Sequence, residues 1–263
     1  MIIFVLTGLE TIELKEIRKH ILPITFSNWW FASTYFVLYI FSPYLNKLLT
    51  SLDKMLYRRL IIIATICWCV IPTFLNCSFQ SNNLIWFMYL YSLSGYLRLY
   101  PDEIKISSKN SIKIALLFVF ATFFTVIICD IIGKKIEFIG KNATYLYGMQ
   151  KLPIVIISIF LFNGFLKSEI KFNKIINTLA KATFGVYLIH DDDYIRVFLW
   201  KKLFKNSVFI NSKILIPYSI VVVLIVYALC TCIELFRIVI LEEKYMKYIE
   251  IISKYIEEKL KIS

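Results

Sequence analysis

Long apolar stretches separated by short polar segments run through the whole chain. A helix needs about 20 mostly apolar residues to cross about 30 Å of hydrocarbon. Seven stretches approach this length, and we predict a membrane span in each: residues 29–45, 60–75, 84–99, 114–132, 152–166, 175–189 and 214–240. The sixth contains Asn177 and Lys181, so a tilted or re-entrant segment is an alternative there. The predicted fold class is therefore all-α, a polytopic transmembrane helical bundle.

The two ends of the chain follow different patterns. Residues 1–9 are apolar but too short to span, so we interpret them as an N-terminal stub, the last turns of a helix. In residues 244–262, apolar side chains such as Met246, Ile249 and Ile252 recur at helical spacing between lysines and glutamates. This pattern predicts an amphipathic helix on the inner membrane surface, with docking to a partner as the alternative. We predict a membrane domain over residues 1–240 and a cytoplasmic tail over residues 241–263.

The composition excludes most other classes of protein. Hydrophobic residues make up 59% of the chain and charged residues 18%, and the mean hydropathy is +0.71. Soluble domains have about 45–50% apolar and about 25% charged residues, so neither a soluble domain nor a disordered chain fits. With only 7 glycines and 6 prolines, a collagenous chain is excluded as well.

The net charge of +12 is explained by the membrane topology. On a soluble domain such a charge would indicate nucleic-acid binding, but in membrane proteins lysine and arginine collect in cytoplasmic loops. Of the 30 basic residues, eighteen fall in one alternating set of loops, which includes the C-terminus, and twelve in the other. We therefore predict a multi-pass cell-membrane protein with a cytoplasmic C-terminus and lipid contacts, and no nucleic-acid partner.

Few side chains stand out as candidates for chemistry. The sequence has no P-loop, GxGxxG, nucleophile elbow or HExxH pattern, and its six cysteines lack metal-ligand spacing, so we predict no metal site. His190 precedes the acidic run Asp191–Asp193, which allows it to be a general base or simply an interfacial residue. His20 lies in a basic loop and is predicted to face solvent.

Two arginines near predicted span ends have more than one interpretation. Arg237 lies three residues after Glu234, so the two share a helix face and are expected to pair. Arg98 follows Ser94-Gly95-Tyr96 in a basic neighbourhood. It is either an ordinary cytoplasmic anchor or a ligand for an anionic headgroup or a cofactor phosphate.

Three segments of the chain carry recognisable motifs. Residues 23–47 (PITFSNWWFASTYFVLYIFSPYLNK) and residues 182–190 (ATFGVYLIH) resemble, respectively, the "WF…Y…LY…SPyLN" segment and the "TFGVYLIH" segment of the acyltransferase 3 family. Residues 91–98 (YSLSGYLR) are similar to a weaker "GY.R/K" element between them. Together the resemblance extends over residues 21–237, in the order that the family has.

The resemblance implies a fold, an activity and a set of candidate residues. The family comprises integral membrane O-acyltransferases of about ten helices, many of which O-acetylate surface polysaccharides. We accordingly expect transfer of an acyl group, with acetyl as the expected one, from acyl-CoA to a hydroxyl of a cell-surface or exopolysaccharide glycan. Acyl-CoA is then a donor substrate, and no bound cofactor is expected. Arg98 is the candidate for the donor phosphates, and His190 the candidate catalytic residue. A second set is expected either to bind the substrate along a path through the bundle or merely to pack helices: Trp30, Tyr35, Tyr39, Asn46 and Tyr187.

Compared with the family, the chain is expected to lack two to three N-terminal helices. The family's catalytic histidine and a nearby arginine lie in its first helix, so the resemblance implies that this chain alone is a poor catalyst. It would then be a truncated remnant or the product of a mis-assigned start codon. A transporter or flippase for glycan intermediates is the competing class, although scarce glycine and the lack of a repeat disfavour it. The oligomeric state is not predicted.

Overall fold

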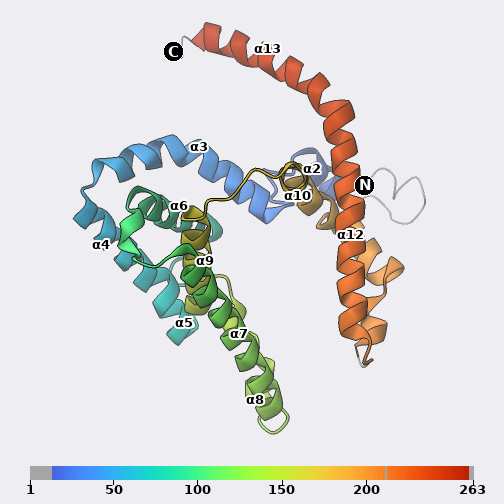
Figure 1. Cartoon of the computed structure of the whole chain (residues 1–263). Helices are drawn as coiled ribbons and strands as arrows, with labels where there is room; N and C mark the ends of the chain where they lie inside the picture. The colour runs from blue at the N-terminus through green and yellow to red at the C-terminus, as the bar shows by residue number, and fades with distance from the viewer. Residues whose placement is uncertain (1–13, 211, 261–263) are drawn as a thin grey trace. The chain divides into compact units, whose positions relative to one another are not determined.

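The computed structural model describes residues 14–210 and 212–260, which form helices and connecting turns with no strand (Figure 1). The predicted all-α class is confirmed for these ranges, and the predicted stub at residues 1–9 lies outside them. The α-helices are α2 (Leu14–Ile21), α3 (Trp30–Ser51), α4 (Lys54–Thr65), α5 (Ile71–Leu75), α6 (Asn83–Leu99), α7 (Ser108–Gly133), α8 (Glu137–Lys141), α9 (Leu152–Leu166), α10 (Lys174–His190), α11 (Asp193–Val197), α12 (Leu215–Arg237) and α13 (Glu243–Leu260). Short π-helical or 3-10 turns are η1 (Ile66–Val70), η2 (Pro101–Glu103), η3 (Tyr145–Tyr147), η4 (Phe198–Leu203), η5 (Asn206–Phe209) and η6 (Ile238–Glu242).

Each predicted span coincides with a helix, but not every helix is long and apolar enough to cross a membrane. Among the described residues, four stretches meet that condition: Lys54–Leu75, Ser108–Gly133, Glu137–Leu166 and Leu215–Glu242. These four stretches support the prediction that the chain is a membrane protein. Helices α6 and α10 have 17 residues each. Seven crossings therefore stay a prediction.

Capping residues explain why two helices begin earlier than the apolar pattern predicts. Asp53 accepts a hydrogen bond from the Leu56 amide at 2.8 Å and starts α4, whereas the predicted span starts at residue 60. Ser107 caps α7 in the same way, and the predicted span starts at residue 114. An N-cap side chain satisfies an amide that the first turn leaves without a partner, so a helix begins at its cap even where that turn is polar.

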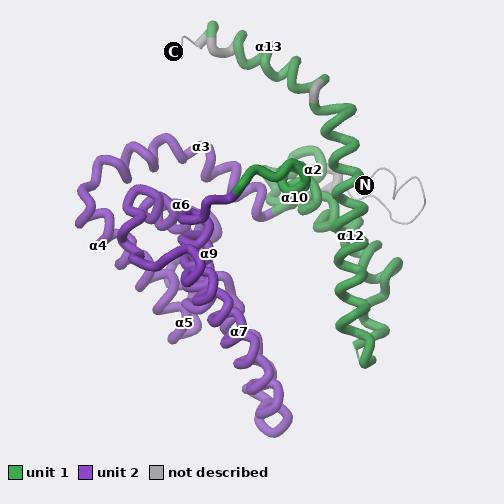
Figure 2. Tube along the Cα trace, viewed as in Figure 1, with its two compact units in different colours: residues 1–29, 171–263 green, residues 30–170 purple. Residues whose placement is uncertain are grey.

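The described chain divides into two compact units (Figure 2). Unit 2 comprises residues 30–170 and contains α3 to α9. Its core is formed by large side chains of α4, α6 and α9, including Tyr57, Trp86, Tyr89 and Val155. Helices α7 and α9 pack closely, and the Ser108 hydroxyl donates to the Gly164 carbonyl at 2.8 Å.

Unit 1 comprises residues 1–29 and 171–263 and is built on the pair α10 and α12. Its core contains Val186 of α10 together with Val222, Val226 and Cys230 of α12. Helix α12 continues through η6 into α13 without a loop, so the predicted tail helix begins as an extension of the preceding apolar helix (Figure 1). Its place on a membrane surface stays a prediction.

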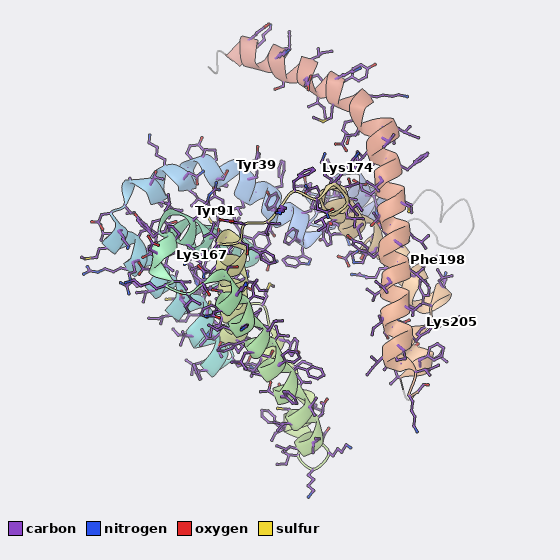
Figure 3. All side chains as sticks on the ribbon, in the orientation of Figure 1. Tyr39, Tyr91, Lys167, Lys174, Phe198 and Lys205 are labelled. Carbon is purple, nitrogen blue, oxygen red and sulfur yellow. The ribbon has the colours of Figure 1, made fainter. Side chains whose placement is uncertain are left out.

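One end of unit 2 gathers basic side chains, and we call it the basic end. There Lys54 and Arg58 of α4 pair with Glu103, which follows α6, at 3.1 and 3.3 Å. Lys167, after α9, donates to the Ile104 carbonyl (Figure 3). The hydrogen bond from Lys54, with the added charge of Arg58, holds the pKa of Glu103 below its usual value.

The other end of unit 2, which we call the distal end, is fastened by polar contacts. The Tyr145 hydroxyl donates to the Thr73 carbonyl at 2.8 Å, and the Thr73 hydroxyl accepts from the Leu152 amide at 2.8 Å. Gln150 donates to Ser81 at 2.8 Å, just before α6 begins. The end of α5, the start of α6 and the start of α9 therefore meet there, opposite the basic end.

Candidate functional site

A cavity of about 380 Å³ opens at the basic end between α3, α4, α6 and α9. Asn46 of α3 and Arg98 of α6 both line it, and the Tyr91 hydroxyl donates to Asn46 Oδ1 at 2.7 Å across it. Tyr91 is labelled in Figure 3. The structure thus places in one cavity two residues that the sequence assigned separately, Asn46 to the substrate and Arg98 to the donor.

Helix geometry accounts for the wall that α6 contributes. Ser94, Gly95 and Arg98 follow Tyr91 by three, four and seven residues, so they lie on the same side of the helix as Tyr91. The Tyr57 hydroxyl donates to the Ser92 carbonyl at 2.8 Å. A Cβ atom at position 95 would lie 3.0 Å from that hydroxyl. The glycine of the "GY.R" segment therefore leaves room for a buried tyrosine beside the arginine.

An apolar cavity of about 360 Å³ adjoins the first one. Side chains of α3, α6 and α9 line it, and it shares the wall residues Tyr91, Ser94 and Phe162 with the Arg98 cavity. Its remaining lining is almost entirely aliphatic or aromatic. A polar space with an arginine next to an apolar space suits a ligand that has an anionic part and a neutral, less polar part.

The electrostatics of the basic end favour an anion. Residues 46–59 and 98–113 together with Lys167 contain nine lysines and arginines against three acidic residues. One of those acids, Glu103, is engaged by Lys54 and Arg58, whereas no carboxylate among the described residues pairs with Arg98. Arg98 is exposed and can present a planar fork of N–H donors to a phosphate.

The other predicted substrate residues of α3 lie outside these two cavities. Tyr35 and Tyr39 are exposed on the helix, Tyr39 at 69%. Tyr39 is labelled in Figure 3. Trp30 packs edge-on against Phe87, with ring centroids 6.1 Å apart. A substrate path along these three residues stays a prediction.

Tyr187 and His190 lie on the last turns of α10 in unit 1. The His190 Nδ1–H donates to the Val186 carbonyl at 2.7 Å, which leaves Nε2 as the basic nitrogen of the neutral ring. The His190 ring is 6.4 Å from that of Tyr187. Asp191 and Asp193 both form ion pairs with Arg196, with N···O distances of 3.3 and 2.8 Å. Among the described contacts, none joins the acidic run to His190.

The histidine that faces a carboxylate is His20, and its predicted exposure to solvent is wrong. Its side chain is 15% exposed, and Nε2 lies 3.7 Å from Asp192 Oδ2. The same carboxylate caps α11 through Oδ1, which accepts from the Tyr194 amide at 3.2 Å. The His20 ring also packs against Tyr194, with centroids 5.3 Å apart. No local sequence signal indicates this pair, because the two segments lie far apart in the chain.

The predicted pair of Glu234 and Arg237 is confirmed. Arg237 donates from Nε and from an Nη atom to the two carboxylate oxygens, at 2.8 and 2.7 Å. It also contacts Glu242 at 2.7 Å and the Tyr245 hydroxyl, at the junction of α12 and α13. The Glu234 side chain is only 8% exposed and packs against Gly185, where a Cβ atom would lie 2.1 Å from its carboxyl carbon. No sequence pattern indicates this contact between α10 and α12.

These features define a helical membrane protein with a basic, ligand-sized cavity. A family model described as an acyltransferase domain, that of the acyltransferase 3 family, matches residues 3–236. The chain therefore belongs to the acyltransferase 3 family, whose members are membrane acyltransferases. Searches of curated proteins and of solved structures each gave no match.

Proposed function

We propose that the protein transfers an acyl group, with acetyl as the expected one, from acyl-CoA to a hydroxyl of a cell-surface or exopolysaccharide glycan. The observation that carries the proposal is the Arg98 cavity beside the apolar cavity at the basic end of unit 2. Coenzyme A combines anionic phosphates with a neutral pantetheine arm that ends in the acyl thioester. The two adjoining cavities match these two kinds of surface.

In this proposal each residue of the cavity has a separate role. Arg98 binds a donor phosphate through charge-assisted hydrogen bonds, which are stronger than those between neutral groups. Asn46, held by Tyr91 at 2.7 Å, presents its amide group toward the pantetheine amides. The apolar cavity excludes water from the thioester arm.

The chemistry is an ordinary acyl transfer. The glycan hydroxyl attacks the thioester carbonyl, a base takes the hydroxyl proton, the C–S bond breaks, and coenzyme A leaves as a thiolate that takes up a proton. His190 of α10 is our candidate base, because its Nδ1–H donates to the Val186 carbonyl and the lone pair of the neutral ring is therefore on Nε2. General base catalysis typically contributes about 10²–10⁴-fold.

The distribution of basic residues along the chain supports the same assignment. Cytoplasmic loops are enriched in lysine and arginine, and acyl-CoA is a cytoplasmic donor. We therefore propose that the basic end faces the cytoplasm, as does the C-terminus, in a cell-membrane protein whose partners are lipids and the glycan acceptor. A glycan transporter or flippase is the alternative, and it would work without coenzyme A.

Replacing Arg98 with glutamine is expected to weaken coenzyme A binding at least about tenfold, or about 1.4 kcal/mol. The reason is the loss of a hydrogen bond to a charged group, typically about 1.5–3 kcal/mol. Isothermal titration of the purified chain with coenzyme A measures this directly.

The matched control is Arg59→Gln, which removes the same charge from an exposed position of α4 at the basic end, outside the cavity. Its affinity is expected to stay within about twofold of the wild type, because screened exposed charges interact weakly. Equal losses of affinity in the two variants would mean that coenzyme A binds to a general basic surface and not to the Arg98 cavity. Absence of binding by the wild type would overturn the donor assignment.

A further inference from the structure

A third cavity, of about 450 Å³, lies at the distal end of unit 2, at the opposite end of the helices from Arg98. It is formed by the end of α5, the last turns of α7, helix α8 and the turn that follows. None of its lining residues carries a charge, in contrast to the Arg98 cavity. It shares no lining residue with the two cavities at the basic end.

Several contacts fasten the walls of this distal cavity. The Tyr145 hydroxyl donates to the carbonyls of Pro72 and Thr73, at 3.0 and 2.8 Å. The Lys151 ammonium donates to the Pro72 carbonyl at 2.6 Å and lies 3.8 Å above the Tyr145 ring. These bonds hold the turn after α8 against the end of α5, so the cavity is a formed feature of the fold.

Two glycines bring α8 back against α7. A Cβ atom at Gly133 would lie 2.4 Å from the Gly140 Cα, so any larger side chain there would force the two helices apart. This close approach places Phe138 and Asn142 of the α8 segment opposite Thr125 and Cys129 of α7 in the lining of the cavity.

The lining combines amide and hydroxyl groups with aromatic rings. Asn76 and Asn142 supply amide groups, whereas the Thr73 hydroxyl already donates to the Cys69 carbonyl and accepts from the Leu152 amide. Phe74 and Phe138 are exposed at 75% and 76%. Asn142 Nδ2 donates one hydrogen bond, to the Phe138 carbonyl at 2.8 Å. Its amide has a second N–H and two acceptor positions to offer a ligand.

From this chemistry we infer that the distal cavity binds a neutral sugar ring of the acceptor. A pyranose has a rim of hydroxyls, which asparagine side chains can bind, and C–H faces, which pack on aromatic rings. The lining residues carry no charge, and the nearby Lys151 ammonium is engaged by the Pro72 carbonyl and the Tyr145 ring. This inference rests on the proposed function, in which donor and acceptor then approach unit 2 from opposite ends.

The reactivity of Cys129 can report whether the distal cavity is occupied. Its thiol is half-buried in the lining, while Cys69 and Cys230 are buried elsewhere. Replacing the other three cysteines, Cys67, Cys77 and Cys232, with serine in the full chain leaves Cys129 as the accessible thiol. The rate at which N-ethylmaleimide modifies it then measures whether the cavity is occupied.

The experiment compares this rate with and without methyl β-D-glucopyranoside or methyl N-acetyl-β-D-glucosaminide. At about ten times its Kd, a bound sugar is expected to slow the modification about tenfold, because only the empty cavity reacts. Asn142→Leu, which is close in size, is expected to abolish the protection, measured as the ratio of the variant's own rates with and without sugar. The control Asn110→Ala, at the exposed start of α7, is expected to retain the protection by sugar.

The outcomes separate this inference from the donor assignment. Lack of protection by both glycosides, or equal protection by the acyclic polyol sorbitol, overturns the sugar site even if coenzyme A still binds. A rate that is slow in liposomes and insensitive to sugar means that lipid fills the cavity, which also overturns it. Protection in a chain that does not bind coenzyme A supports the sugar site and overturns the donor assignment instead.

Discussion

Replacing Gly185 with alanine is expected to lower the free energy of unfolding by about 2–3 kcal/mol. The new Cβ atom would lie 2.1 Å from the carboxyl carbon of Glu234, which is only 8% exposed. Glu234 has little freedom to move, because Arg237 holds both of its oxygens. Overpacking of this kind typically costs about 1–3 kcal/mol, and disrupting the half-buried ion pair of Glu234 and Arg237 adds to it.

Helix propensity makes the sign of this result informative. In a helix interior, alanine is about 1 kcal/mol more favourable than glycine, so propensity alone predicts that Gly185→Ala stabilises α10. Thermal unfolding of the purified chain measures which effect is larger. The double variant Gly185→Ala/Glu234→Ala removes the clash and is expected to be more stable than the sum of the single effects. A more stable single variant would contradict the packing of Glu234 on α10.

The second large effect is expected for Asn163→Ala, which should lower the free energy of unfolding by about 2 kcal/mol. Asn163 is 1% exposed on α9 and donates to the Ser111 hydroxyl of α7 at 2.7 Å. Hydrogen bonds between helices of membrane proteins contribute about 0.6–2 kcal/mol, and truncating a buried side chain leaves a cavity as well. The loss is therefore expected to loosen the α7–α9 pair.

Asn110→Ala is the matched control, because Asn110 is exposed on the first turn of α7. Its effect on the unfolding temperature is expected to be small, since exposed substitutions usually change stability by less than about 0.5 kcal/mol. In the Asn163→Ala background, Ser111→Ala is expected to add little. Equal destabilisation by the Asn163 and Asn110 variants would show that the bond between the helices contributes nothing.

The sequence pattern predicts the helices well because each apolar stretch is long and its period is simple. Helix starts were predicted less well, since polar caps such as Asp53 lie outside the apolar stretch that defines a span. The Glu234–Arg237 pair was predictable because three residues on a helix fix the distance. The family was recognisable from local segments, and the match over residues 3–236 confirms it.

Contacts between segments that lie far apart in the chain could not be predicted from the sequence. Nothing around His20 indicates that Asp192 faces it, and nothing in the "TFG" segment indicates that a glutamate packs on Gly185. The distal cavity is likewise assembled from three separate segments, none of which carries a recognisable motif. For the site itself, only the individual residues Asn46 and Arg98 were predicted, and their common cavity depends on how α3 packs against α6.

The most direct test of the account is photolabelling with an acyl-CoA that carries a diazirine on its acyl chain. The proposed donor site predicts that the label attaches to the lining of the two cavities in α3, α6 or α9, and that excess coenzyme A suppresses it. Arg98→Gln is expected to reduce the same labelling, while Arg59→Gln is not. Mass spectrometry of the labelled peptides locates the site. Label confined to residues 171–263, or insensitive to excess coenzyme A, would contradict donor binding at the basic end.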